Sequence, residues 1–138
     1  MIKKKQSKQF RNVQVEIYVG EAGSGKTRKA IEEAGDDYYI LDQSERVWFD
    51  GYDYEKTLII DDFYGWIKYG QLLRILDGHQ YRCEIKGGFK YAAWTKVIIT
   101  SNAQPNEWYQ KGLTPALQRR ISNITRFDTA SRKPSARS

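Results

Sequence analysis

One stretch near the start of the chain has the residue types and spacing needed to hold a chain of phosphates. It fits the pattern G-x-x-x-x-G-K-[ST] at every fixed position and consists of Gly20, Glu21, Ala22, Gly23, Ser24, Gly25, Lys26 and Thr27. The glycines allow a tight turn whose backbone N–H groups face inward, and together with a following helix N-terminus they form an anion nest. Lys26 adds a positive charge for the β- and γ-phosphates, and the Thr27 hydroxyl is a suitable ligand for Mg²⁺. The stretch therefore predicts a site for a nucleoside triphosphate with Mg²⁺.

Two adjacent acids, Asp61 and Asp62, follow the next strongly apolar run, residues 57–60. We expect Asp61 to hold Mg²⁺ through a water molecule, and Asp62 to orient an attacking water or accept its proton. A pair of acids favours hydrolysis over transfer to a second substrate. Asn102 follows another apolar run, residues 96–100. It either orients the attacking water near the γ-phosphate or simply forms a turn, and spacing alone leaves both interpretations open.

The elements that must position these residues alternate between strand and helix. Apolar patterns predict strands at 13–19, 38–41, 57–60, 96–100 and 124–127, and helices at 26–34, 67–76 and 116–120, the last one capped by Thr114 with Pro115 as its first residue. Residues 81–85 and 89–93 flank Lys86-Gly87-Gly88 and predict a β-hairpin. Repeated strand–helix alternation predicts an α/β fold with a mostly parallel central sheet flanked by helices.

Length and charge suggest one domain between two basic ends. The chain has 138 residues, and we expect a basic arm at 1–12, a domain at 13–128 and a basic flexible tail at 129–138. The net charge of +6 arises at these ends, because residues 13–118 contain 12 basic and 16 acidic side chains. Basic ends either attract nucleic acid or remain as solvated tails. No apolar run is long enough to span a membrane, and one cysteine and one histidine exclude a disulfide framework and any chemistry that needs two histidines.

Five further segments carry a resemblance to a known family. They occur in order and are 48–52, 59–66, 85–88, 98–109 and 116–121. With the phosphate-binding stretch, they make the chain similar to the superfamily 3 helicase (ATPase) domain of circovirus-type replication initiator (Rep) proteins of small circular single-stranded DNA viruses. The resemblance covers roughly residues 13–127. It implies a P-loop NTPase fold of the AAA+-like kind, with a β-hairpin insertion.

The resemblance also assigns roles around the nucleotide. Lys26 and Thr27 correspond to the Walker A pair, Asp61 and Asp62 to Walker B, and Asn102 to the motif C sensor. ATP and Mg²⁺ are the implied cofactors. The implied activity is ATP hydrolysis that moves DNA, in a viral replication protein of the host nucleus.

The same resemblance implies partners. Lys86, Lys90 and Lys96 correspond to the hairpin region that faces single-stranded DNA in the central channel of a ring, and the ring is a homo-oligomer, a hexamer in this family. The segment 116–121 corresponds to the one that bears an arginine finger, which acts on the γ-phosphate of a neighbouring subunit. We favour Arg120 over Arg119 for this role, on the spacing found in the wider superfamily.

Two other interpretations remain open. A small P-loop kinase would need an acceptor pocket and a lid arginine, and a DNA-binding module with a relic nucleotide site would bind DNA independently of ATP. The sequence also departs from a full Rep protein. One histidine cannot supply the metal motif of its endonuclease, so we expect no DNA nicking by this chain. Residues 1–12 are too few for the family's helical oligomerisation segment, so we expect a weak hexamer.

Overall fold

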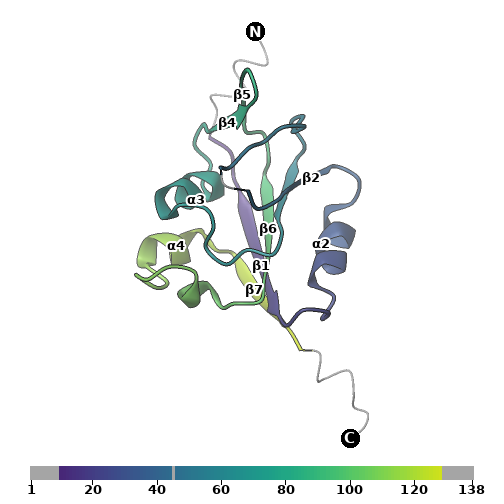
Figure 1. Ribbon diagram of the computed structural model, residues 1–138, viewed down its shortest axis with the longest axis vertical. Helices are drawn as coiled ribbons and strands as arrows, with labels where there is room; N and C mark the ends of the chain where they lie inside the picture. Colours follow the sequence, from purple (N-terminus) through teal and green to yellow (C-terminus); the bar gives the residue numbers. More distant parts are fainter. Residues whose placement is uncertain (1–9, 45, 129–138) are drawn as a thin grey trace, which may run out of the picture.

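A five-stranded, wholly parallel sheet lies at the centre of the molecule (Figure 1). The structure is a computed structural model and describes residues 10–44 and 46–128. Within them the strands run in the order β2-β3-β6-β1-β7. They are β1 (Gln14–Gly20), β2 (Tyr38–Leu41), β3 (Thr57–Ile60), β6 (Lys96–Ser101) and β7 (Asn123–Phe127). The predicted α/β class with a mostly parallel sheet is therefore confirmed.

Helices cover both faces of this sheet. Helix α2 (Lys26–Ala34) packs on one face, and α3 (Tyr69–Leu76) and α4 (Pro115–Arg120) lie on the other (Figure 1). The predicted cap of α4 is confirmed, because the Thr114 hydroxyl accepts a hydrogen bond from the Leu117 N–H at 3.2 Å. Helix α3 begins two residues later than expected, since Ile67 is buried in the preceding loop and Lys68 has a non-helical backbone, with ψ at 142°. None of the helices within the described residues is long and apolar enough to cross a membrane.

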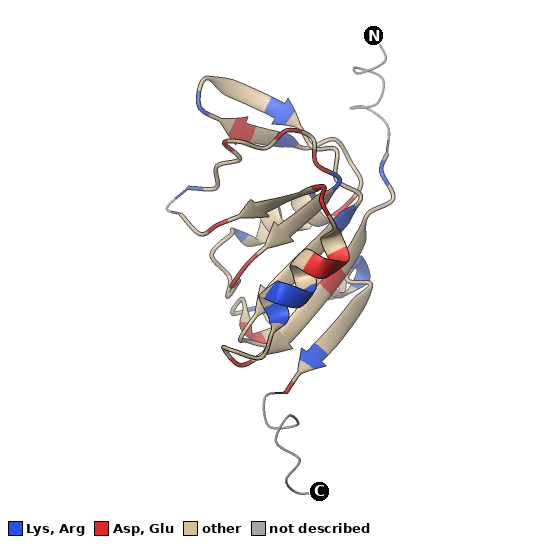
Figure 2. Cartoon of the chain, turned by 90° about the vertical axis from the view of Figure 1, so that its right-hand side faces the viewer, with Lys and Arg blue, Asp and Glu red and all other residues tan. Residues whose placement is uncertain are grey.

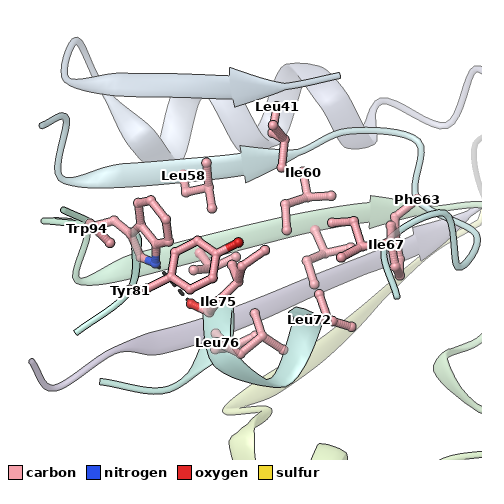
Figure 3. Packing of buried hydrophobic residues seen from close by; sticks show 14 of the residues in the cluster. Leu41, Leu58, Ile60, Phe63, Ile67, Leu72, Ile75, Leu76, Tyr81 and Trp94 are labelled. Atoms are coloured by element: carbon pink, nitrogen blue, oxygen red, sulfur yellow. Dashed lines mark hydrogen bonds between the residues drawn. The ribbon is translucent and has the colours of Figure 1, made fainter. Parts of the chain in front are cut away.

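Strand alternation explains why apolar residues fill both faces. Val15, Ile17 and Val19 of β1 join the large core on the side of α3 and α4, whereas Tyr18 joins a smaller cluster with Ala30 of α2. Figure 3 shows the large core, in which side chains from strands, loops and α3 meet. Even its largest side chain has its polar atom satisfied: the Nε1–H of fully buried Trp94 donates to the Ile75 carbonyl at 3.0 Å.

The predicted hairpin is confirmed as β4 (Arg82–Ile85) and β5 (Gly88–Tyr91), which pair in antiparallel fashion. It lies at the end of the molecule opposite the start of α2 (Figures 1 and 2). Its turn requires a positive φ, which Gly87 supplies at 86°. The side chain of Lys86 is therefore carried at the tip, far along the chain and in space from the phosphate-binding stretch.

Part of the predicted basic arm belongs to the folded domain. The Arg11 N–H donates to the Gly78 carbonyl at 2.8 Å, and its guanidinium donates to the carbonyls of Trp94 at 2.6 Å and His79 at 2.8 Å. A side chain at position 78 would lie 1.7 Å from the Arg11 carbonyl oxygen, so only glycine permits this approach. Arg11 is thus bound by backbone carbonyls and is not part of a free arm. Residues 1–9 and the predicted tail at 129–138 lie outside the described residues.

Candidate nucleotide site

The strand order brings the predicted nucleotide-binding residues to one edge of the sheet. Strand β6 lies between β1 and β3, with Val19 opposite Ser101 and Ile60 opposite Ile99. All three strands are parallel, so the segments that follow them leave the same edge. These segments are the phosphate loop (residues 20–27), the turn that begins at Asn102, and the aspartate pair. The carboxyl edge of an open parallel sheet is where α/β proteins generally bind ligands.

The phosphate loop depends on its glycines for space and for backbone conformation. Gly20 passes so close to β7 that a side chain there would lie 2.4 Å from the Phe127 carbonyl oxygen. Gly23 and Gly25 have φ values of 81° and 91°, in the left-handed region that other residues rarely adopt. No side chain caps the N-terminus of α2 at Gly25. Its first N–H groups are therefore available to an anion, as the predicted nest requires.

Lys26, the first residue of α2, is held over the loop. Its ammonium donates to the Glu21 carbonyl at 2.9 Å and contacts the Ser24 hydroxyl oxygen at 3.5 Å, and only 7% of the residue is exposed. Burial lowers the pKa of the Lys26 ammonium, while the negative charges of Asp62 and Asp61 act to raise it. The charge of Lys26 is therefore held at the phosphate loop and interacts favourably with both predicted Walker B acids.

Asp61, which follows β3, is hydrogen-bonded to residues of α2 and β6. Its Oδ1 atom accepts hydrogen bonds from the Thr27 hydroxyl at 2.9 Å and from the Thr100 hydroxyl at 2.8 Å. The carboxylate and the Thr27 hydroxyl form an oxygen donor set that fits Mg²⁺, which proteins bind through one or two carboxylates together with substrate phosphates. Within the described residues no group of three or more His, Cys, Asp or Glu could form a complete metal cage.

Asp62 has an unusual backbone and an exposed side chain. Its φ is 55°, in the left-handed region that few residues other than glycine adopt. Its N–H donates to the Thr100 hydroxyl at 2.8 Å, and its carbonyl accepts from the Trp66 Nε1–H at 3.0 Å. Asp and Asn adopt this region more readily than other non-glycine residues, and here both backbone polar groups of Asp62 are hydrogen-bonded. The exposed carboxylate is available to a water molecule.

Thr100 is a site residue that the sequence analysis missed. It belongs to an apolar strand pattern, and in the structure it is 1% exposed, with its hydroxyl between the two aspartates. The only signal in the sequence is a hydroxyl at the polar end of an apolar run. Asn102, two residues later, is exposed at the same edge of the sheet. The structure thus brings Asn102 to the correct edge, and its predicted role as a sensor stays a prediction.

The two candidate finger arginines differ sharply in their surroundings. Arg120, the favoured residue, donates to the Leu73 carbonyl at 3.2 Å and the Ala116 carbonyl at 2.8 Å, and pairs with Asp77 at 3.4 Å. Its guanidinium thus ties α4 to α3 instead of pointing outward. Arg119 is exposed on the same helix. Of the two, Arg119 is the one whose charge is free to reach another molecule.

The three lysines predicted to contact DNA do not share one surface. Lys86 is exposed at the hairpin tip. Lys90 turns inward, where its ammonium donates to the Tyr52 carbonyl. Lys96 is not on the hairpin at all: it begins β6 and lies 3.9 Å from Glu33 of α2. Within the hairpin, Lys90 shares a face with buried Cys83, its partner in the register, whereas Lys86 lies in the turn.

The outward face of the hairpin presents residues that were not singled out from the sequence. The Arg82 guanidinium lies 4.6 Å from the ring centroid of Phe89, and 44% of Phe89 is exposed. The pairing of Arg82 with Tyr91 and of Glu84 with Phe89 puts these side chains on the face opposite Lys90. Figure 2 shows that the hairpin carries both signs of charge. On its outward side the Glu84 carboxylate is paired with Arg46 at 2.8 Å.

Comparison with known sequences identifies similar proteins. Residues 17–103 match the model of a family described as RNA helicase. The chain is 38% identical over 112 residues to the replication-associated protein of beak and feather disease virus, covering 80% of this chain and 38% of that protein. It is 42% identical over 108 residues to the replication-associated protein of human associated cyclovirus 1, covering 73% of this chain and 38% of that protein. It is 37% identical over 121 residues to the replication-associated protein of porcine circovirus 1, covering 84% of this chain and 38% of that protein. The chain therefore spans less than half the length of these relatives.

Comparison with solved structures supports the fold. The chain is similar to a JCV helicase whose structure was determined by X-ray methods, with a TM-score of 0.53 and 15% sequence identity. The match covers 86% of this chain and 36% of the JCV helicase chain. Agreement at this low identity means that the two share a fold, as the P-loop helicase interpretation of the sequence predicts.

Proposed function

Because the chain belongs to the superfamily 3 helicase domains of circovirus-type replication-associated proteins, we propose that it is an ATP-hydrolysing motor domain that moves single-stranded DNA. The single observation that carries the proposal is the convergence on Asp61. Its Oδ1 accepts hydrogen bonds from Thr27, at the phosphate loop, and from Thr100, at the end of the strand between loop and aspartates. A triphosphate site, a metal-holding acid and a second acid are thus joined at one edge of the sheet. The inferred setting is the nucleus of a host cell.

The proposed reaction is attack of water on the γ-phosphate. The loop N–H groups and Lys26 bind the β- and γ-phosphates and stabilise the charge that develops on their oxygens. Thr27 and Asp61 would hold Mg²⁺, which neutralises phosphate charge when it is bound. Asp62 orients the water and accepts its proton as the bond to the β–γ bridging oxygen breaks, which leaves ADP and phosphate. Asn102 is proposed to donate to the same water or to the γ-phosphate.

The proposed assembly is a ring, a hexamer, in which each site is completed by a neighbouring subunit. Helix α4 lies on the face of the sheet opposite α2, which opens with Lys26 (Figure 1). The exposed Arg119 therefore belongs to a helix that lies across the sheet from α2. We assign the trans-acting role to Arg119 and a structural role to Arg120, which is occupied by α3. An arginine supplied by a neighbour stabilises charge on the transferred phosphoryl group.

The proposed DNA contact is the hairpin. Lys86 at its exposed tip would meet phosphates without reading sequence, and Arg82 with Phe89 adds a charged and aromatic surface on the outward face. Lys90 and Lys96 are less available, because each is engaged by groups of its own chain. DNA bound by such a hairpin would move as hydrolysis shifts one subunit against the next.

Replacing Lys26 tests the nucleotide site. We expect Lys26→Ala to lower phosphate release from ATP by about 10²- to 10³-fold, since it removes a charge aimed at the transferred phosphate. The matched control is Lys29→Ala, which removes an exposed lysine of the same helix that pairs with Glu33. Release is followed with radiolabelled γ-phosphate. Label on a small acceptor would favour a kinase, and unchanged release in Lys26→Ala would contradict the proposed site.

Replacing Lys86 tests the DNA contact. We expect Lys86→Glu to weaken binding of a fluorescent single-stranded oligonucleotide, and to lower the slope of log affinity against log salt by about one unit for each phosphate that is no longer neutralised. Phosphate release without DNA should not change, because the hairpin and the phosphate loop lie at opposite ends of the molecule. Lys111→Glu, the same charge change on the α3 side of the sheet, is the control. Equal weakening in both variants would reject a specific role for the hairpin tip.

A further inference from the structure

We propose that Thr100 is a positioning residue for hydrolysis, whose one hydroxyl sets the orientation of both aspartates. The hydroxyl donates to Asp61 Oδ1 at 2.8 Å and accepts from the Asp62 N–H at 2.8 Å. The Thr100 carbonyl also accepts from the Phe63 N–H at 2.8 Å. Three consecutive residues are thus bound by one residue of the neighbouring strand. The inference rests on the proposed function, because it gives these aspartates their catalytic meaning.

The chemistry of this position requires a hydroxyl. One oxygen must donate a proton to a carboxylate and accept one from a backbone N–H at the same time, which serine and threonine do and which valine, of nearly the same shape, cannot. The site is buried, so water cannot readily replace the missing partner. Without the hydroxyl, Asp61 Oδ1 retains the bond from Thr27 as its one described hydrogen bond. Its carboxylate is then less constrained in rotation.

Asp62 depends on Thr100 in a different way. Its left-handed backbone, with φ at 55°, is uncommon even though Asp tolerates it, and both of its backbone polar groups are held by hydrogen bonds. Thr100 holds the N–H and Trp66 holds the carbonyl. Loss of the first bond would let the backbone relax toward commoner conformations and would move the carboxylate that is proposed to accept the proton of water. Thr100 therefore acts on metal binding through Asp61 and on the chemical step through Asp62.

The test compares Thr100→Val with Thr100→Ser. We expect Thr100→Val to raise the Mg²⁺ concentration needed for half-maximal phosphate release by about 10- to 100-fold, the usual effect of removing a group that orients a metal ligand. The value of kcat at saturating Mg²⁺ should fall as well, and Thr100→Ser should restore both to within a few-fold. Binding of a fluorescent ATP analogue gives a second readout: without Mg²⁺ the three proteins should bind equally, and with Mg²⁺ the valine variant should gain less affinity.

Controls separate this role from a loss of stability. Thr57→Val makes the same change at a buried threonine that begins β3, at the end of that strand far from Asp61. It should leave unchanged the Mg²⁺ concentration needed for half-maximal phosphate release. An unchanged midpoint and kcat in folded Thr100→Val would overturn the proposal, as would equal losses in Thr100→Ser. If the valine variant does not fold, Thr100→Cys is compared with Thr100→Ser instead. Cysteine is similar in size to serine, and its thiol is a weaker hydrogen-bonding group. Absence of any phosphate release by wild-type protein would instead reject the proposed function, and Mg²⁺-dependent binding of the analogue would still decide the role of Thr100.

Discussion

Asp62→Asn protein is expected to release phosphate from ATP about 10²- to 10⁴-fold more slowly than wild-type protein. Its affinity for nucleotide is expected to equal that of the wild type. The substitution removes the proposed proton acceptor and keeps the size of the side chain. It is also compatible with the backbone, because Asn, like Asp, is among the residues that tolerate the left-handed region in which Asp62 is held. A loss of activity would therefore report on the carboxylate and not on the conformation of the turn.

The measurement is single-turnover phosphate release, with binding of a fluorescent ATP analogue as the companion. Asp36→Asn, at an exposed aspartate after α2, makes the same chemical change away from the site and should be silent. Release within a few-fold of wild type would exclude Asp62 as the proton acceptor. In that case Asp61 or the γ-phosphate itself would have to accept the proton.

Arg119→Ala is expected to lower kcat by about 10³-fold with little change in nucleotide binding, the scale on which an arginine supplied by a neighbour acts. Arg120→Ala should behave differently. It removes the bonds from α4 to the Leu73 carbonyl and to Asp77, and the partly buried partners left unpaired would lower the free energy of unfolding by about 1–3 kcal/mol. Thermal unfolding and phosphate release, measured on both variants, separate the two roles.

Mixing variants tests whether the arginine acts on a neighbour. Arg119→Ala subunits retain an intact Asp62, and Asp62→Asn subunits retain Arg119, so a mixed ring contains some complete sites. Partial recovery of activity on mixing is expected, and it should depend on total protein concentration if the ring is weak. No recovery would count against action in trans. A folded but inactive Arg120→Ala beside an active Arg119→Ala would return the role to Arg120.

The geometry of the candidate nucleotide site was predictable from the sequence where its residues belong to a contiguous motif. The phosphate loop, Asp61 and Asp62 each follow a strand, and parallel strands bring their carboxyl ends together whatever their order. Thr100 could not be found in this way. Its role depends on β6 being inserted between β1 and β3 and on the register that sets Ile60 opposite Ile99. Strand order, and register between strands far apart in the sequence, are settled by tertiary pairing.

The direction in which side chains point was the other feature that the sequence did not predict. Arg119 and Arg120 are adjacent on a helix, so they point about 100° apart, and only the packing of α4 on α3 decides which is exposed. Lys90 faces inward because it pairs with buried Cys83 in the hairpin register. Arg11 appears in a run of basic residues, yet three carbonyls bind it. Each case depends on tertiary contacts that composition and periodicity do not specify.

The parallel pairing of β1 has a consequence for how the protein acquires its structure. Gln14 of β1 lies opposite Lys96 of β6, and Glu16 lies opposite Asn123 of β7, so the first strand of the sheet pairs with its last two. During synthesis β1 cannot form these pairings until most of the described chain has been made. Until then the apolar side chains and backbone polar groups of β1 lack their partners, and chains at such a stage are prone to aggregate.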